Sequence, residues 1–258
     1  MGCPSGERFA RTALLFSPEQ LDRLWHAHVM IFGVGGVGSY AAEALCRSGI
    51  GKLSLVDGDT VDESNINRQL PALCSTLGRP KASVVRERLL DIAPDAQVEA
   101  IEAFHLPGKQ VLVPQDTAFL VDAVDTVAAK IDLALIGLRR GIPMITCMGM
   151  GNRLDPTQIR MGDLFETSGC PLCRVMRREL RKRGVISLRC VYSTEPVKGA
   201  SAQRVLSPDP EARPSKPITG RADSMRPPPG SVAYVPAVAG LYMAYEVVRV
   251  LCGEVDKE

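Results

Sequence analysis

Short apolar runs alternate with segments of helical spacing between residues 28 and 148. Residues 28–32 form an apolar run that ends in glycines, which is typical of a buried parallel strand. Residues 39–47 carry helix formers at helical spacing, and two glycines follow them. The same reasoning predicts strands at residues 52–56, 97–101, 118–121 and 144–148, and helices at residues 81–92 and 126–140. This alternation predicts an α/β fold with a doubly wound, mostly parallel, Rossmann-like sheet.

The pattern changes near residue 152. Residues 163–183 are basic and predicted to be helical, and residues 189–193 are predicted to form a further strand. Residues 196–236 hold nine of the 19 prolines and are expected to form a long, partly mobile loop before a C-terminal helix that begins near Pro236. We expect one integrated domain with an N-terminal helical segment at 1–27, a Rossmann-like half at 28–152 and an extension at 153–258.

The composition fits a protein that buries a core. Of the 258 residues, 45% are hydrophobic and 23% are charged, which argues against a mostly disordered chain. The net charge is only +2, so any surface for nucleic acid must be a local basic patch. No secretion signal is visible, and the eight cysteines are therefore expected to be reduced thiols of a cytoplasmic protein. The apolar stretch at 232–251 contains Glu246 and Arg249, which predicts a buried helix and no membrane span.

A glycine-rich turn follows the first predicted strand and opens the next predicted helix. Gly33, Gly35, Gly36 and Gly38 have the spacing G-x-G-x-x-G, which lets the backbone turn tightly and approach a phosphate. Asp57 ends the second predicted strand about 20 residues further on, where an acidic residue binds ribose hydroxyls in such folds. The turn predicts a nucleotide site, but its spacing alone does not choose between NAD, FAD and ATP.

Charged and amide side chains crowd the segments beyond the predicted strand ends. Residues 57–69 hold several carboxylates and amides with one arginine, Lys81 opens a predicted helix, and Asp125 follows another strand. A triphosphate needs cations to neutralise its charge and a carboxylate for Mg²⁺, whereas a dehydrogenase needs little of this. The set therefore favours ATP over a dinucleotide.

Four motifs in this order resemble those of the adenylating superfamily that includes ubiquitin-activating enzymes and bacterial activators of sulfur-carrier proteins. They are the glycine turn, NINRQ at 65–69, GRPK at 78–81 and DAVD at 122–125. Within this superfamily the chain most resembles the tRNA threonylcarbamoyladenosine dehydratase branch. That resemblance is carried by RF at 8–9, SGIG at 48–51, LDPT at 154–157, RRELRK at 177–182 and VYSTE at 191–195.

The resemblance implies a role for each matching residue. The four glycines would cradle the nucleotide, and Asp57 and Asp59 would bind beside its ribose. Asn65, Arg68 and Lys81 would hold the phosphates, and Asp125 would position Mg²⁺. Arg11 matches an arginine that reaches into the ATP site of the partner subunit, which implies a homodimer. The catalytic set implied in this way is Arg11, Arg68, Lys81 and Asp125.

The resemblance also implies a reaction. ATP would activate the carboxylate of N6-threonylcarbamoyladenosine in tRNA as an acyl adenylate, and cyclisation would follow with net loss of water and release of AMP and pyrophosphate. A second hypothesis is activation of the C-terminal Gly-Gly of a ubiquitin-like sulfur-carrier protein. A nucleotide-sensing module without activity is a third hypothesis, and Arg68, Lys81 and Asp125 argue against it because a sensor needs no Mg²⁺ carboxylate.

A basic stretch lies in the C-terminal part of the chain. Residues 174–189 hold seven lysines or arginines and one acidic residue. On a helix, Arg174, Arg177, Arg178 and Arg181 would share one face, which could attract tRNA phosphates. A solvated helix face is the alternative, and the dehydratase resemblance favours tRNA.

Three cysteines in the C-terminal half need separate consideration. Cys170 and Cys173 have the spacing of a metal-ligand pair, but a structural zinc site needs four ligands and the second pair is missing. We expect no zinc and two reduced thiols. Cys190 lies where sulfur-carrier activators use a cysteine, yet a buried strand residue is the more common state of a free cysteine. A sulfur-relay or cysteine-desulfurase-type protein remains a possible partner.

Overall fold

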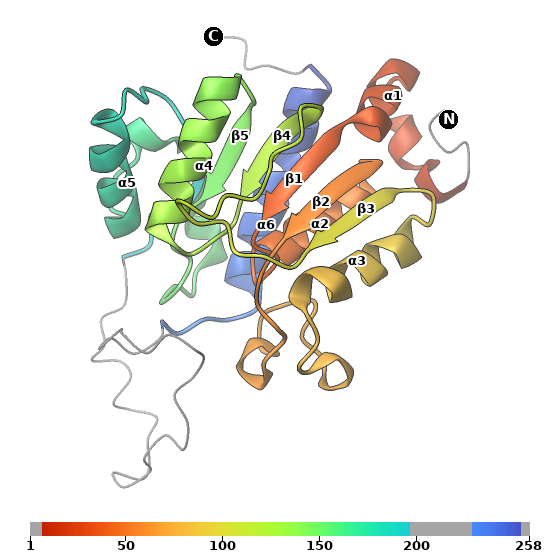
Figure 1. Ribbon diagram of the computed structural model, residues 1–258, viewed down its shortest axis with the longest axis horizontal. Coiled ribbons are helices and arrows are strands. Elements are labelled where there is room, and N and C mark those ends of the chain that lie inside the picture. The colour runs from red at the N-terminus through yellow and green to blue at the C-terminus, as the bar shows by residue number, and fades with distance from the viewer. Residues whose placement is uncertain (1–6, 197–228, 254–258) are drawn as a thin grey trace, which may run out of the picture.

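The computed structural model describes residues 7–196 and 229–253, and its centre is a seven-stranded sheet with the order β3-β2-β1-β4-β5-β7-β6 (Figure 1). The strands are β1 (His28–Phe32), β2 (Lys52–Val56), β3 (Gln97–Ile101), β4 (Thr117–Asp122), β5 (Met144–Cys147), β6 (Ile159–Asp163) and β7 (Arg189–Ser193). Every neighbouring pair is parallel except β6 and β7. The predicted doubly wound, mostly parallel α/β fold is confirmed.

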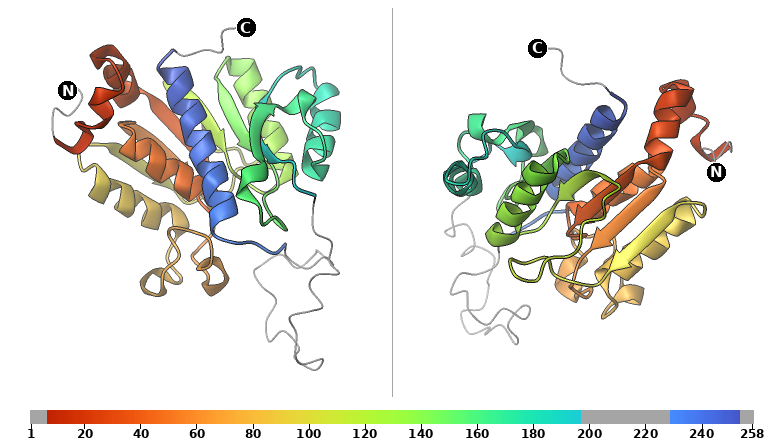
Figure 2. Two further views of the ribbon diagram at one scale, coloured as in Figure 1. Left: turned by 180° about the vertical axis from the view of Figure 1, so that it is seen from behind. Right: turned by 45° about the horizontal axis from the view of Figure 1, so that its top comes forward.

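Helices cover both faces of this sheet. They are α1 (Pro18–His26), α2 (Gly38–Arg47), α3 (Lys81–Ile92), α4 (Val127–Arg140), α5 (Pro171–Arg181) and α6 (Tyr234–Leu251). Figures 1 and 2 show α2, α3 and α6 against one face of the sheet and α4 against the other. The short helix α5 packs beside α4.

The alternating side chains of β1 explain why both faces are covered. Val29 and Ile31 are fully buried in the larger core cluster, beneath α2 and α6. Met30 and Phe32 point to the opposite face and are fully buried in a separate cluster that includes α4 residues. A strand that is buried on both faces is mostly apolar, as the four residues after His28 are, and this apolar run allowed β1 to be predicted from the sequence.

Two predictions about the C-terminal part need correction. The segment 163–183 is not one helix, because Asp163 ends β6 and α5 begins only at Pro171. Gly169 adopts a left-handed backbone conformation with a φ of 76°, which interrupts a helix before that point. Strand β6 was not predicted, and it adds an antiparallel edge to the sheet. Most of the predicted loop, residues 197–228, lies outside the described residues.

The apolar helix α6 packs into the body of the protein. It is the one helix, among those the structure describes, that is long and apolar enough to cross a membrane by length and composition. However, Val235, Ala239 and Met243 are buried against the core, and Glu246 is buried and pairs with Arg249 at 2.9 Å. Burial of this kind is typical of the core helix of a globular domain.

Candidate functional site

The candidate site lies where the central strands end. Gly33 follows β1, Asp57 follows β2, and Asp125 lies in the loop after β4. Because β2, β1 and β4 are adjacent and parallel, these three loops meet at one edge of the sheet. Chain order reverses between β1 and β4, and ligands of open α/β sheets bind at such a point.

The glycine turn is too tight for side chains. Gly33 has a φ of 83°, and a Cβ atom on Gly38 would lie 1.8 Å from the carbonyl oxygen of Gly33. A Cβ atom on Gly33 would in turn lie 2.8 Å from the carbonyl oxygen of Ala123, in the loop after β4. The turn therefore brings its backbone N–H groups, and the N-terminus of α2, to a place where they can bind phosphate.

Asp57 ties the glycine turn to the end of β2. Its carboxylate accepts hydrogen bonds from Val34 N at 2.8 Å and from Asp59 N at 2.9 Å. Burial raises the pKa of Asp57, although these two hydrogen bonds act in the opposite direction. A half-buried carboxylate held at this strand end is placed as a ribose-binding carboxylate would be.

Two cations flank the glycine turn. Lys81 is buried at the start of α3, and its Nζ lies 3.1 Å from Asp59 Oδ2. Arg68 is half-buried, its Nη1 donates to Ser64 O at 2.9 Å, and burial lowers the pKa of its guanidinium. Its side chain also lies against Gly36, 3.5 Å from where a Cβ atom would stand. Both cations can therefore reach phosphates held by the turn.

The amides of this segment play different parts. Asn65 is buried, and its Oδ1 accepts from Asp62 N at 3.3 Å within a capping turn, so the structure gives its side chain a local structural role. Gln69 ends the NINRQ motif, but the sequence analysis gave it no role of its own. Its side chain lies 3.5 Å from a Cβ position on Gly35, and its buried Oε1 has no hydrogen-bond partner. An orphaned acceptor beside the glycine turn is what an incoming ligand with a donor group would satisfy.

Asp125 is exposed in the loop beyond β4 and accepts a hydrogen bond from Thr126 Oγ1 at 3.2 Å. No group of three or more histidine, cysteine or acidic side chains that could hold a metal occurs within residues 7–196 and 229–253. Mg²⁺ needs few protein ligands, because nucleotide phosphates and water complete its shell. One carboxylate therefore fits a Mg²⁺ ion that arrives with ATP.

A buried ion pair supports the loop that carries Asp125. Lys130 Nζ lies 3.2 Å from both carboxylate oxygens of Asp122, and both residues are fully buried. The same ammonium donates to Cys147 O at 2.7 Å and to Thr146 Oγ1 at 3.2 Å. This network joins β4, α4 and β5, so Asp122 has a structural role in the DAVD motif, whereas Asp125 is exposed in the loop that follows.

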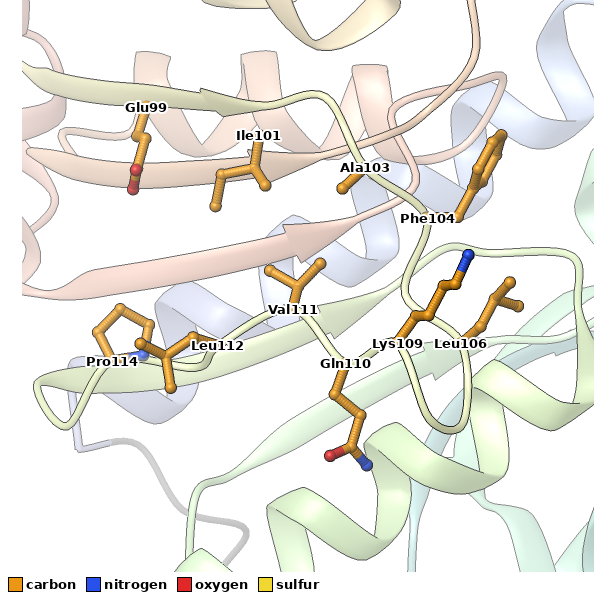
Figure 3. A pocket seen from close by; sticks show the side chains of 10 residues that line it. All are labelled: Glu99, Ile101, Ala103, Phe104, Leu106, Lys109, Gln110, Val111, Leu112 and Pro114. Atoms are coloured by element: carbon orange, nitrogen blue, oxygen red, sulfur yellow. The ribbon is translucent and has the colours of Figure 1, made fainter.

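Phe104 is a second residue that the sequence reading missed. It follows β3, its side chain is 54% exposed, and its ring lies 2.7 Å from where a Cβ atom on Gly58 would stand. Gly58 follows Asp57, so an exposed aromatic ring lies beside the residue that is predicted to bind the ribose. Figure 3 shows Phe104 at one end of a 770 Å³ hollow between β3 and residues 106–114. An aromatic ring here can stack on the base of a nucleotide.

Replacing Phe104 by alanine is expected to raise the KM for ATP about tenfold with little change in kcat, because base stacking contributes ~1–3 kcal/mol. Steady-state kinetics with varied ATP would measure this. Ile186→Ala, at an apolar residue that is 86% exposed and does not line this hollow, is the control and should leave the KM for ATP unchanged. An unchanged KM in the Phe104 variant would remove this residue from the site.

The structure does not bring Arg11 to the other predicted site residues. Arg11 is exposed and lies before α1. Arg8, three residues earlier, pairs at 3.6 Å with Asp95, which precedes β3. Figure 1 shows this N-terminal segment at the end of the sheet opposite the loops that carry Lys81 and Asp125. Within one chain, Arg11 is therefore remote from the candidate site.

The basic residues of α5 divide into two groups. Arg174, Arg178 and Arg181 are exposed, and Arg181 lies over the Phe165 ring at 5.3 Å. Arg177 departs from the expected shared face, because its side chain is half-buried and donates to Thr167 O at 2.6 Å. Arg177 therefore holds α5 to the preceding turn and is removed from the candidate tRNA-binding face.

Cys170, Cys173 and Cys190 form a buried sulfur cluster between α5 and β7. Each is at most 3% exposed, all are free, and the Cys173 thiol contacts both of the others. The hydrogen bond with Cys170 lowers the pKa of Cys173, but the hydrogen bond with Cys190 and burial act in the opposite direction and raise it to about 11. Thiols that are buried and protonated are typical of core packing, in contrast to the exposed, low-pKa thiols of reactive sites.

Similar proteins were found by sequence and by structure. The model of the ThiF family matches residues 9–258. The tRNA threonylcarbamoyladenosine dehydratase of Bacillus subtilis is 38% identical over 252 residues, covering 96% of each chain. The crystal structure of E. coli TcdA, a tRNA N6-threonylcarbamoyladenosine dehydratase, in complex with ATP matches with a TM-score of 0.80 at 31% identity, over 96% of this chain and 95% of that one. The Escherichia coli sulfur carrier protein ThiS adenylyltransferase is 31% identical over 147 residues, covering 56% of this chain and 58% of its own.

Proposed function

Because the chain belongs to the ThiF family, we propose that it uses ATP to dehydrate N6-threonylcarbamoyladenosine in tRNA to its cyclic form. The observation that carries this proposal is the similarity to a dehydratase across 96% of both chains. The similarity to a sulfur-carrier adenylyltransferase covers only 56% of this chain, so that activity is the second candidate. The geometry of the site suits both candidates, since each forms an acyl adenylate.

The chemistry follows from the charges around the glycine turn. A carboxylate oxygen of the threonyl group attacks the α-phosphorus of ATP, and pyrophosphate leaves. The glycine turn, Arg68 and Lys81 neutralise the phosphates, and Asp57 fixes the ribose. Asp125 would hold Mg²⁺, which supplies further positive charge to the leaving group. The carbamoyl group then closes on the activated carbonyl and AMP leaves with the former carboxylate oxygen, so the net change in the tRNA is loss of one water.

No side-chain nucleophile is needed for cyclisation. The attacking group is already attached to the same nucleoside as the activated carbonyl, so proximity supplies much of the rate. A buried Cys190 fits this account, because no thioester relay is required. We therefore assign ATP binding to residues 28–152 and tRNA binding to the extension at 153–258.

We also propose that the enzyme works in the cytoplasm as a homodimer in which Arg11 serves the ATP site of the partner subunit. The support is its position, exposed and remote from the site of its own chain. Mixing an Arg11→Ala subunit with a Lys81→Ala subunit should restore activity in the heterodimer. A sulfur-relay partner remains a prediction.

A change of charge on α5 is expected to weaken tRNA binding. The double variant Arg174→Glu/Arg178→Glu should bind tRNA more weakly. The slope of log Kd against log salt concentration should also become shallower, by the amount expected for the loss of about two phosphate contacts. Binding titrations at several salt concentrations would measure both. Arg139→Glu, at an exposed residue in the last turn of α4, is a single-site control that makes half of this charge change away from α5. An unchanged salt slope in the double variant would exclude α5 as the tRNA-binding surface.

Pyrophosphate release with Mg-ATP tests the choice between the two candidate functions. We expect stimulation by tRNA that carries the open modification and none by tRNA whose modification is already cyclised. A Gly-Gly-tailed ubiquitin-like protein should not stimulate release. If the ubiquitin-like protein stimulated pyrophosphate release and neither tRNA did, the function would instead be activation of a sulfur-carrier protein.

A further inference from the structure

Arg153 is a buried arginine in the loop after β5, and its charge is not neutralised within the described structure. The side chain is 2% exposed, and both Nε and Nη1 are buried without a hydrogen-bond partner. No other described residue forms an ion pair with it. A buried guanidinium without an anion is strongly unfavourable, because water has been removed from the charge and nothing replaces it. Such a group indicates an anion that arrives from outside.

The loop around Arg153 is fixed on both sides. Asn152 N donates to Gly230 O at 2.8 Å, and Gly230 N donates to Asn152 Oδ1 at 2.7 Å. Asn152 has a φ of 58°, which is rare for a residue with a side chain. On the other side, Leu154 N and Asp155 N both donate to Glu195 Oε2 at 2.9 Å. With its neighbours held in this way, the position of Arg153 is imposed by the fold.

The same loop is joined to the nucleotide site. Strand β5 lies beside β4, whose following loop carries Asp125. The segment that binds Asn152 also binds the Arg68 region, since Asn67 Nδ2 donates to Ser231 O at 3.0 Å. Pro236 then lies 3.5 Å from the Cβ position of Gly36 in the glycine turn. Arg153 therefore lies in a loop at the same edge of the sheet as the glycine turn and Asp125.

The charges of the proposed reaction leave one anion without a partner. Arg68 and Lys81 serve the phosphates of ATP, and the exposed arginines of α5 serve the tRNA backbone. The carboxylate that attacks the α-phosphorus has no assigned cation. A guanidinium matches a carboxylate in shape and can bind both of its oxygens. Resting on the proposed function, we infer that Arg153 binds the carboxylate of the threonylcarbamoyl group and holds it toward ATP.

The test compares two forms of one tRNA that differ in this carboxylate. The open modification carries it, and the cyclised modification does not. The wild-type protein should bind the open form about 10- to 100-fold more tightly, as expected for a hydrogen-bonded charge pair. In Arg153→Met, which removes the charge and keeps a long side chain, this ratio should fall to near one while affinity for the cyclised form is retained. Arg160→Met, at an exposed arginine in β6, should keep the wild-type ratio.

Each outcome has a distinct meaning. An Arg153→Met protein that keeps the wild-type ratio overturns the inference, whether or not its melting temperature changes. A changed oligomeric mass with an unchanged ratio would show that a second copy of the chain supplies the anion, which also overturns it. Arg153→Lys keeps the charge and should retain part of the preference for the open tRNA over the cyclised tRNA. This variant can therefore replace Arg153→Met in the test if the methionine variant does not fold. A wild-type protein that forms no AMP with either tRNA would instead overturn the proposed function.

Discussion

Replacing Lys81 by methionine is expected to lower the rate of AMP formation by about 10²- to 10³-fold, the usual cost of removing one charged donor from a developing phosphate charge. Lys81 is buried at the start of α3, so its ammonium acts where water screens it little. Its partner Asp59 has a half-exposed side chain and can be solvated when the lysine is lost. The variant should therefore fold, and a rate assay at saturating ATP would report the catalytic effect.

Lys52→Met is the control for this prediction. Lys52 begins β2 at the opposite edge of the sheet, where its Nζ donates to Asp116 Oδ2 at 2.5 Å. We expect its AMP formation to stay within about twofold of the wild type, as for most surface substitutions. A Lys81→Met protein with full ATP turnover would show that the phosphates lie elsewhere.

Gly38→Ala is expected to raise the Kd for ATP at least about 100-fold. The added Cβ atom would lie 1.8 Å from Gly33 O and 2.9 Å from Gly33 C, and these backbone atoms cannot move aside as the end of a flexible side chain could. The glycine turn must open to accept it, and misplacement of about 1 Å can cost about 10²-fold in rate. Calorimetric titration with ATP would show a Kd raised by at least this factor.

Gly162→Ala separates this effect from the general cost of the substitution. Gly162 lies in β6, and its nearest neighbour to an added Cβ atom is Tyr192 at 4.0 Å. ATP affinity should therefore be unchanged in this variant. If Gly38→Ala also bound ATP normally, the glycine turn would not be the phosphate site.

The central sheet could be predicted because its strands are locally distinctive. The bounds predicted for β1, β2, β3 and β7 agree with the structure, since each is a short run between turn residues. Strand β6 was missed because only Ile159 of its five residues is buried, and its glycine and aspartate resemble a loop. The resemblance to the dehydratase branch is confirmed by the relatives found, and it rested on motifs that occur in loops at one edge of the sheet.

The residues that the sequence did not identify depend on contacts between distant segments. Nothing in the sequence around Phe104 indicates a binding role, and only the folded chain shows that its ring lies against Gly58. Arg153 stands in a polar loop, and only the folded chain shows that its guanidinium is buried. Arg177 has the helical spacing of its exposed neighbours, but a carbonyl of the preceding turn draws it inward. The hydrophobic periodicity and the composition of a segment do not show whether such a side chain is buried, because burial depends on the distant segments that pack against it.

The mass of the modified nucleoside tests the central claim most directly. tRNA carrying open N6-threonylcarbamoyladenosine would be incubated with the protein, with and without Mg-ATP, and digested under conditions that preserve the cyclic form. The account predicts that the nucleoside loses the mass of one water only when protein and Mg-ATP are both present, with one AMP formed for each nucleoside changed. A nucleoside of unchanged mass, in the presence of a protein that cleaves ATP, would contradict it.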